Sequence, residues 1–120
     1  MTRLLRYTLV GALATTAHYA LLVLGVEAFA WPAWVASGLG ATAGAQLAYV
    51  GNRRYTFGHR GAVGASWLRF QITALFGALQ GMAIVAAGVA LGVHYVIAQI
   101  VATLAGLLAT FAINRLWTFR

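Results

Sequence analysis

The chain lacks most of the residues on which enzyme chemistry depends. Its 120 residues contain no cysteine and no lysine, and Glu27 is the one acidic residue. Without cysteine there are no disulfides, thiolate metal sites or cysteine nucleophiles, and a single carboxylate excludes the paired acids of glycoside hydrolysis. There is no phosphate-binding loop with its lysine, and His18, His59 and His94 do not have the spacing of metal ligands. We therefore expect neither an enzyme, nor a cofactor, nor a metal.

Charged residues are scarce, and almost all of them are cationic. They make up 8% of the chain, against 62% hydrophobic residues, whereas a typical soluble domain has about 25% charged and roughly 45–50% apolar residues. No soluble fold of this size can bury so much apolar surface, so part of the solvent must be lipid. The net charge of +7 comes from eight arginines that lie between apolar segments. Such arginines favour anionic lipid head groups, and not nucleic acid, as partners.

Four apolar segments are long enough to cross a bilayer, whose hydrocarbon core of about 30 Å requires roughly 20 residues of helix. The first is uncharged over residues 7–26, longer than the ~7–15 apolar residues of a cleaved signal peptide, so we expect a retained helix. Pro32 suits the first turn of the second. We predict an all-α membrane protein with four transmembrane helices at about residues 7–29, 32–51, 67–91 and 95–113.

The arginines set the expected orientation. In the four-span arrangement every arginine falls on one side of the membrane, and the positive-inside rule makes that side cytoplasmic. Glu27 and His94 fall on the outer side. We predict a multi-pass protein of the cytoplasmic (inner) membrane with both termini in the cytoplasm. The arginines are Arg3 and Arg6 before the first helix, Arg53, Arg54, Arg60 and Arg69 between the second and third, and Arg115 and Arg120 after the fourth.

The second half of the chain repeats features of the first. Residues 52–57 (Asn-Arg-Arg-Tyr-Thr-Phe) end the second helix, and residues 114–119 (Asn-Arg-Leu-Trp-Thr-Phe) end the fourth. Because each half holds two helices, the halves share one orientation, as in a parallel repeat with its axis along the membrane normal. We predict a single domain over residues 1–120, made of two helical hairpins at about residues 6–58 and 69–120. The same offset pairs Ala36 with Ala98, Ala43 with Ala105 and Gly44 with Gly106. Arg6-Tyr7 is echoed by Arg69-Phe70, with the spacing slipped by one residue.

These features resemble the GtrA-like family of small four-helix membrane proteins. The resemblance rests on residues 6–11 (Arg-Tyr-Thr-Leu-Val-Gly), Thr15, His18-Tyr19 and the two Asn-Arg-x-aromatic-Thr-Phe segments, and it covers residues 6–119. Tyr55, where the motif usually has tryptophan, is a mild departure. The resemblance implies translocation of polyprenyl-phosphate-linked sugars, or a helper role in that step, in cell-surface polysaccharide synthesis and glycosylation.

Repeated arginines and asparagines are the candidate site for the phosphate. The guanidinium fork fits phosphate oxygens in pairs, and the predicted helix ends place these residues on one membrane face. The alternative is that topology alone explains the arginines and helix capping the asparagines. The candidate head-group residues are Arg53, Arg115, Asn52, Asn114, Arg6 and Arg69.

Polar residues within the spans are a second candidate site. His18 lies near the middle of the first helix, where polar side chains usually face the bundle interior and are often functional. It would bind a sugar hydroxyl or carry a proton, or else be satisfied by Gln46, Gln80 or a helical carbonyl. Glu27 is either a solvated carboxylate at the interface, or an acceptor for sugar hydroxyls or a proton site linked to His18.

Three functions remain open from the sequence. The first is a flippase that moves a polyprenyl-phosphate-linked monosaccharide, passively or with protons. The alternatives are a membrane scaffold that recruits a glycosyltransferase and a small multidrug-type transporter. The last fits less well, because His18 occupies the depth where such transporters carry a glutamate and because all eight arginines fall on one side. Four helices leave little room for a bulky head group, so we expect a homo-oligomer or an open lateral groove.

Overall fold

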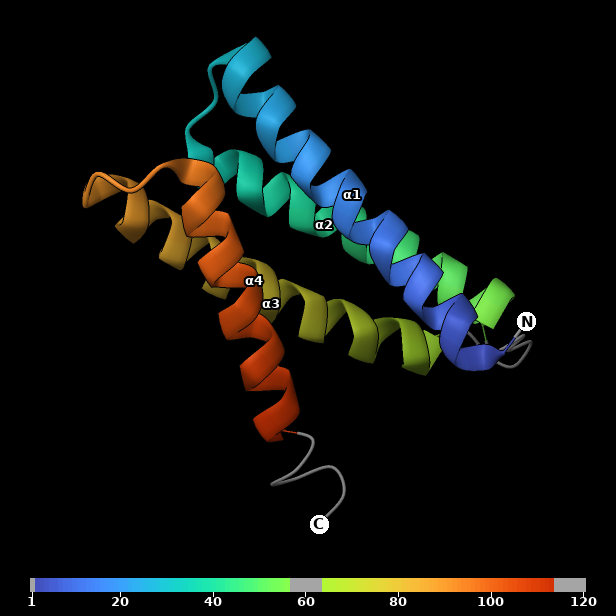
Figure 1. Cartoon of the computed structure of the whole chain (residues 1–120). Helices are drawn as coiled ribbons and strands as arrows, with labels where there is room; N and C mark the ends of the chain where they lie inside the picture. The colour runs from blue at the N-terminus through green and yellow to red at the C-terminus, as the bar shows by residue number, and fades with distance from the viewer. Residues whose placement is uncertain (1, 57–63, 114–120) are drawn as a thin grey trace.

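The computed structural model describes residues 2–56 and 64–113. In these ranges the chain is all-α, with helices α1 (Arg3–Phe29), α2 (Ala33–Gly51), α3 (Gly64–Ala90) and α4 (Tyr95–Ile113) (Figure 1). A short π-helix, η1 (Asn52–Thr56), continues α2. The predicted four helices are confirmed, and their ends lie within a few residues of the predicted positions.

Local sequence signals determine where α1 begins and ends. At its start, the hydroxyl of Thr2 caps the helix by accepting a hydrogen bond of 3.1 Å from the Leu5 amide. The helix ends at Ala30, which adopts a left-handed conformation with φ of 55°. Pro32 lies two residues later, and its carbonyl accepts hydrogen bonds from the amides of Val35 and Ala36 in the first turn of α2. Pro32 therefore lies just before α2, and the turn between the helices is only three residues long.

Glycines on α2 allow α1 and α2 to pack closely along most of their length. A Cβ added at Gly40 would lie 2.5 Å from the carbonyl oxygen of His18, and one at Gly44 would lie 2.8 Å from that of Ala14. No larger residue fits between these backbones, which is the usual role of small residues between membrane helices. Figure 1 shows the two helices running side by side.

The second hairpin packs differently. Gly92, with φ of 86°, makes the turn between α3 and α4. Near this turn Val85, Ala98 and Ala102 form a small buried core. Farther along, α4 continues away from the end of the molecule where the start of α1, the end of α2 and the start of α3 lie together (Figure 1). The two hairpins thus have similar sequences and unequal packing.

The surface suits a lipid environment. Leucines lie exposed along the helices, including Leu13 (66%), Leu107 (63%) and Leu108 (70%), more apolar surface than a soluble monomer tolerates. Two described helical segments, Leu4–Phe29 and Trp67–Ala90, are long and apolar enough to cross a membrane. Helices α2 and α4 have 19 residues each, a length of about 28 Å. Crossing by all four helices, the orientation and the parallel arrangement of the repeats stay predictions.

Candidate head-group site and polar interior

The start of α1 packs against η1 and brings several candidate phosphate ligands to one end of the molecule. Val10 lies against Gly51, where an added Cβ would be 2.8 Å from its Cγ1. One turn before Val10 is Arg6, and the residues after Gly51 are Asn52 and Arg53. These three side chains are half-buried, and α1 contacts η1 directly.

The start of α3 lies at the same end of the molecule (Figure 1). The rings of Tyr49 on α2 and Phe70 on α3 have centroids 5.2 Å apart. Arg69, next to Phe70, is exposed there. The structure therefore brings Arg6, Asn52 and Arg53 together and places Arg69 on the adjoining helix. The repeat partners Asn114 and Arg115 lie outside the described residues.

The π-helix η1 sets the backbone conformation of Asn52 and Arg53. Asn52 has a right-handed helical conformation, with φ of −68° and ψ of −39°, and its amide donates to the carbonyls of both Ala48 and Tyr49. The chain therefore does not stop at Asn52 but widens into η1. Single π-turns inside helices are frequent at functional sites, and here the wider turn carries Arg53 and Arg54.

His18 lies between α1, α2 and α4. Its ring packs over Gly40, where an added Cβ would be 2.8 Å from the ring carbon Cδ2. The imidazole lies beside the Gln99 side chain and the Ser37 backbone. Its Nε2 is shielded from solvent and has no hydrogen-bond partner in the described part of the chain.

The structure does not show Gln46 or Gln80, the expected partners of His18, bound to it among the described contacts. Gln46 and Gln71 exchange two hydrogen bonds, of 2.7 and 3.0 Å, and so join α2 to α3. Gln80 is half-buried on α3. The neighbour that the structure gives His18 is Gln99 from α4.

Gln99 is the centre of a polar network that the sequence did not single out. Gln99 and Ser37 are buried, with 2% and 1% exposed, and the Ser37 hydroxyl donates to Gln99 Oε1. The carbonyl of Gln99 accepts from the hydroxyls of Tyr19, at 3.3 Å, and Thr103, at 2.9 Å. The hydroxyl oxygens of Tyr19 and Thr103 are 2.7 Å apart. The network joins α1, α2 and α4 within the apolar layer, and the four-residue spacing of Gln99 and Thr103 was its one signal in the sequence.

A hollow of about 320 Å³ lies among α1, α2 and α3. Glycine and alanine form most of its wall, and Thr15 and His18 are its polar lining. A smaller hollow of about 220 Å³ beside it contains Thr42, Gln46 and Gln71 and shares Ala45 and Ala74 with it.

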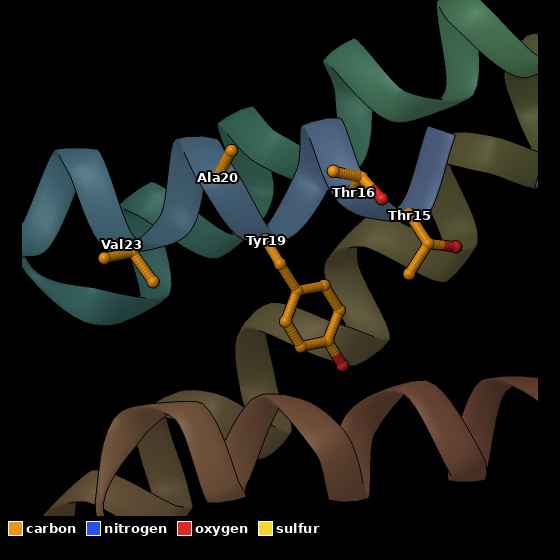
Figure 2. A pocket seen from close by; sticks show the side chains of 5 residues that line it. All are labelled: Thr15, Thr16, Tyr19, Ala20 and Val23. Carbon is orange, nitrogen blue, oxygen red and sulfur yellow. The ribbon is translucent and has the colours of Figure 1, made fainter. Parts of the chain in front are cut away.

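A third, open hollow of about 490 Å³ lies along α1 and shares Thr15 with the first. Tyr19 also lines it, and Figure 2 shows the Tyr19 ring reaching from α1 toward α4. The three hollows are therefore neighbours, and together they form a lateral groove with apolar walls and a few polar groups.

Glu27 lies at the opposite end of α1 from Arg6. Its Oε1 accepts a hydrogen bond of 2.7 Å from the Tyr95 hydroxyl at the start of α4. The rings of Tyr95 and His94 stack with centroids 4.7 Å apart. His18 is nine residues away along α1, about 13 Å at 1.5 Å per residue, so a proton link between Glu27 and His18 would need intermediate groups.

Comparisons with known proteins identify the chain at the family level. Searches of curated proteins and of solved structures find no match. At the family level, residues 6–119 match the family described as GtrA/DPMS, transmembrane domain, which confirms the resemblance drawn from the sequence. The match covers nearly the whole chain and includes α2, α3, α4 and all of α1 except its first three residues. The chain therefore belongs to the GtrA/DPMS transmembrane domain family, whose members are membrane proteins associated with translocation of polyprenyl-linked sugars and with polysaccharide synthesis.

Proposed function

We propose that this protein moves a polyprenyl-phosphate-linked monosaccharide across the cytoplasmic membrane. Family membership gives the class of cargo. The observation that carries the proposal is the packing of α1 on η1, which groups Arg6, Asn52 and Arg53 beside membrane-embedded helices. We propose that this end faces the cytoplasm and that both termini lie on that side.

The grouped arginines would hold the phosphate of the carrier. A phosphate that leaves water must exchange its hydration for protein donors, because an unpaired buried charge is very costly. Two guanidinium groups and an amide offer several donors in planar arrangements that match phosphate oxygens. Asn114 and Arg115 follow α4, which leads away from this end of the molecule (Figure 1), so they would join the site only if α4 moved toward α3.

The lateral groove would take the sugar. Its hollow of about 320 Å³ among α1, α2 and α3 falls within the roughly 300–1,000 Å³ of typical ligand pockets. Thr15 and His18 supply hydrogen-bonding groups in a wall that is otherwise alanine and glycine. The open side lets the polyprenyl tail stay in lipid while the head group crosses, and transport driven by consumption of the product or by protons needs no nucleotide site.

Reconstitution into liposomes tests the proposal. Purified protein should increase exposure of a fluorescent polyprenyl-phosphate sugar on the opposite leaflet, measured by its accessibility to an added quencher. Arg53→Ala should remove most of this activity, and Arg53→Lys should restore part of it, because lysine keeps the charge without the fork. The matched control is Arg54→Ala, which removes the same charge from an exposed neighbour on η1.

The outcomes separate translocation from the scaffold alternative. Wild-type protein that leaves the quenching unchanged from empty liposomes would contradict translocation. If such protein also retained a glycosyltransferase on purification from native membranes, the scaffold function would be favoured over translocation. Equal loss in Arg53→Ala and Arg54→Ala, with insertion reduced in both, would return these arginines to a purely topological role.

A further inference from the structure

The first hairpin is tightly packed from its turn to its far end. Near the turn, a Cβ at Gly25 would lie 3.0 Å from the Ala36 Cβ. Farther along, a Cβ at Gly44 would lie 2.8 Å from the Ala14 carbonyl oxygen, and Leu22, between Ala14 and Gly25 on α1, is fully buried. We call a hairpin closed when its two helices make contacts of this kind both near the turn and at the far end.

The second hairpin reproduces this packing only near its turn. A shift of 63 positions aligns Gly25 with Gly88, and a shift of 62 aligns Ala36 with Ala98. A Cβ at Gly88 would lie 2.8 Å from the Ala98 Cβ, as the alignment requires. Val85, the counterpart of Leu22, is likewise fully buried.

Beyond that point the correspondence breaks down. The counterparts of Ala14 and Gly44 are Gly77 on α3 and Gly106 on α4. Within the described part of the chain, a Cβ at either glycine would meet no atom of another helix within 4 Å. The sequence therefore carries small residues for a close helix contact that the structure does not make.

Among the described side chains of α4, those that form hydrogen bonds to other helices lie in its first half. Tyr95 binds Glu27 at the start of α4. One turn later, Gln99 accepts a hydrogen bond from the Ser37 hydroxyl, and a turn after that Thr103 shares a hydrogen bond with Tyr19. After Thr103, Leu107 and Leu108 are exposed by 63% and 70%. The described residues after Thr103 are thus held less firmly than the first two turns of α4.

We propose that α4 pivots about its contact with Gly88 and closes onto α3, bringing Gly106 against Gly77 as Gly44 lies against Ala14. Gly77 lines the hollow that contains Thr15 and His18, so this closure covers the hollow from the lipid side. The structure shows the open arrangement. The role of α4 as a lateral gate for the cargo rests on the proposed translocation, whereas the movement itself does not.

Disulfide trapping tests the movement directly, because the natural chain has no cysteine. The variant Gly77→Cys/Gly106→Cys places thiols where there is open space, so folding should be undisturbed. A disulfide requires Cα atoms about 4.4–6.8 Å apart, so we expect it to form when α4 closes. The full chain in lipid nanodiscs would be oxidised with copper phenanthroline and analysed by gel mobility and peptide mass.

Two cysteine pairs serve as controls. Gly88→Cys/Ala98→Cys joins positions already in contact and should cross-link rapidly. Gly77→Cys/Leu107→Cys moves one thiol by a single residue, about 100° around the helix, and should cross-link poorly. We expect Gly77→Cys/Gly106→Cys to form a disulfide within one chain in most molecules.

If Gly77→Cys/Gly106→Cys does not cross-link while Gly88→Cys/Ala98→Cys reacts fully, the proposed movement of α4 is wrong. Cross-links that form only between chains would also contradict the movement, and would make this face a contact between copies.

In liposomes, oxidised Gly77→Cys/Gly106→Cys should lose most of its transport and regain it on reduction, with wild type unaffected. An intramolecular disulfide that leaves transport unchanged would overturn the gating role. Transport by wild type without cross-linking refutes only this inference, whereas cross-linking without wild-type transport refutes only the proposed function.

Discussion

Replacing Gly40 by alanine tests the close packing of α1 on α2. The added Cβ would lie 2.5 Å from the carbonyl oxygen of His18 and 2.8 Å from Cδ2 of its ring. Non-bonded carbon contacts are normally about 3.5–4.0 Å, so the two helices would have to separate by roughly 1 Å at this point. A backbone oxygen cannot rotate aside as a flexible side chain can. We therefore expect a loss of about 1–3 kcal/mol in the free energy of unfolding, the usual cost of overpacking.

The matched control is Gly11→Ala. A Cβ at Gly11 would meet no atom of another described helix within 4 Å, and alanine is favoured over glycine within a helix by about 1 kcal/mol. Thermal unfolding in detergent, followed by tryptophan fluorescence, should show Gly40→Ala melting below wild type and Gly11→Ala melting at or above it. Equal melting temperatures for the two variants would refute the tight α1–α2 contact.

Two further predictions concern polar contacts between helices. Gln46→Leu leaves the Gln71 amide without its two hydrogen bonds and should cost about 1–3 kcal/mol. The double variant Gln46→Leu/Gln71→Leu should recover much of this loss in a double-mutant cycle, and simple additivity would argue against the pair. Gln99→Leu should lower the melting temperature more than Tyr95→Phe, because Gln99 is buried at the meeting of three helices whereas Tyr95 binds an exposed carboxylate. The reverse order would contradict the central place of Gln99.

The helices themselves were predictable from the sequence because the bilayer sets their length. The apolar segments fixed the ends of α2 and α4 to within one residue of those observed. Pro32 and Gly92 lie in the two described turns, where a proline and a residue with positive φ belong. The start of α3 was placed at residue 67 instead of Gly64, because Ser66 and the glycines before it do not resemble a transmembrane segment.

The contacts between helices were not predictable in the same way. They depend on the rotation of each helix about its axis, which a weakly amphipathic segment does not determine. Gln46 was a candidate partner of His18, yet it binds Gln71, because its face of α2 meets α3. Likewise, the sequence repeat implies equal hairpins, whereas tight packing at Gly44 has no counterpart at Gly106.

The sidedness of the chain is the most direct test of the account, since docking of the phosphate requires the arginine-bearing end to face the cytoplasm. Single cysteines at Thr2 and at Ala28, both exposed, would be labelled with a membrane-impermeant maleimide, and a reporter would be fused after Arg120. In intact cells Ala28→Cys should react, Thr2→Cys should react only after permeabilisation, and the reporter should show a cytoplasmic C-terminus. Labelling of Thr2→Cys from outside, or termini on opposite faces, would contradict the account.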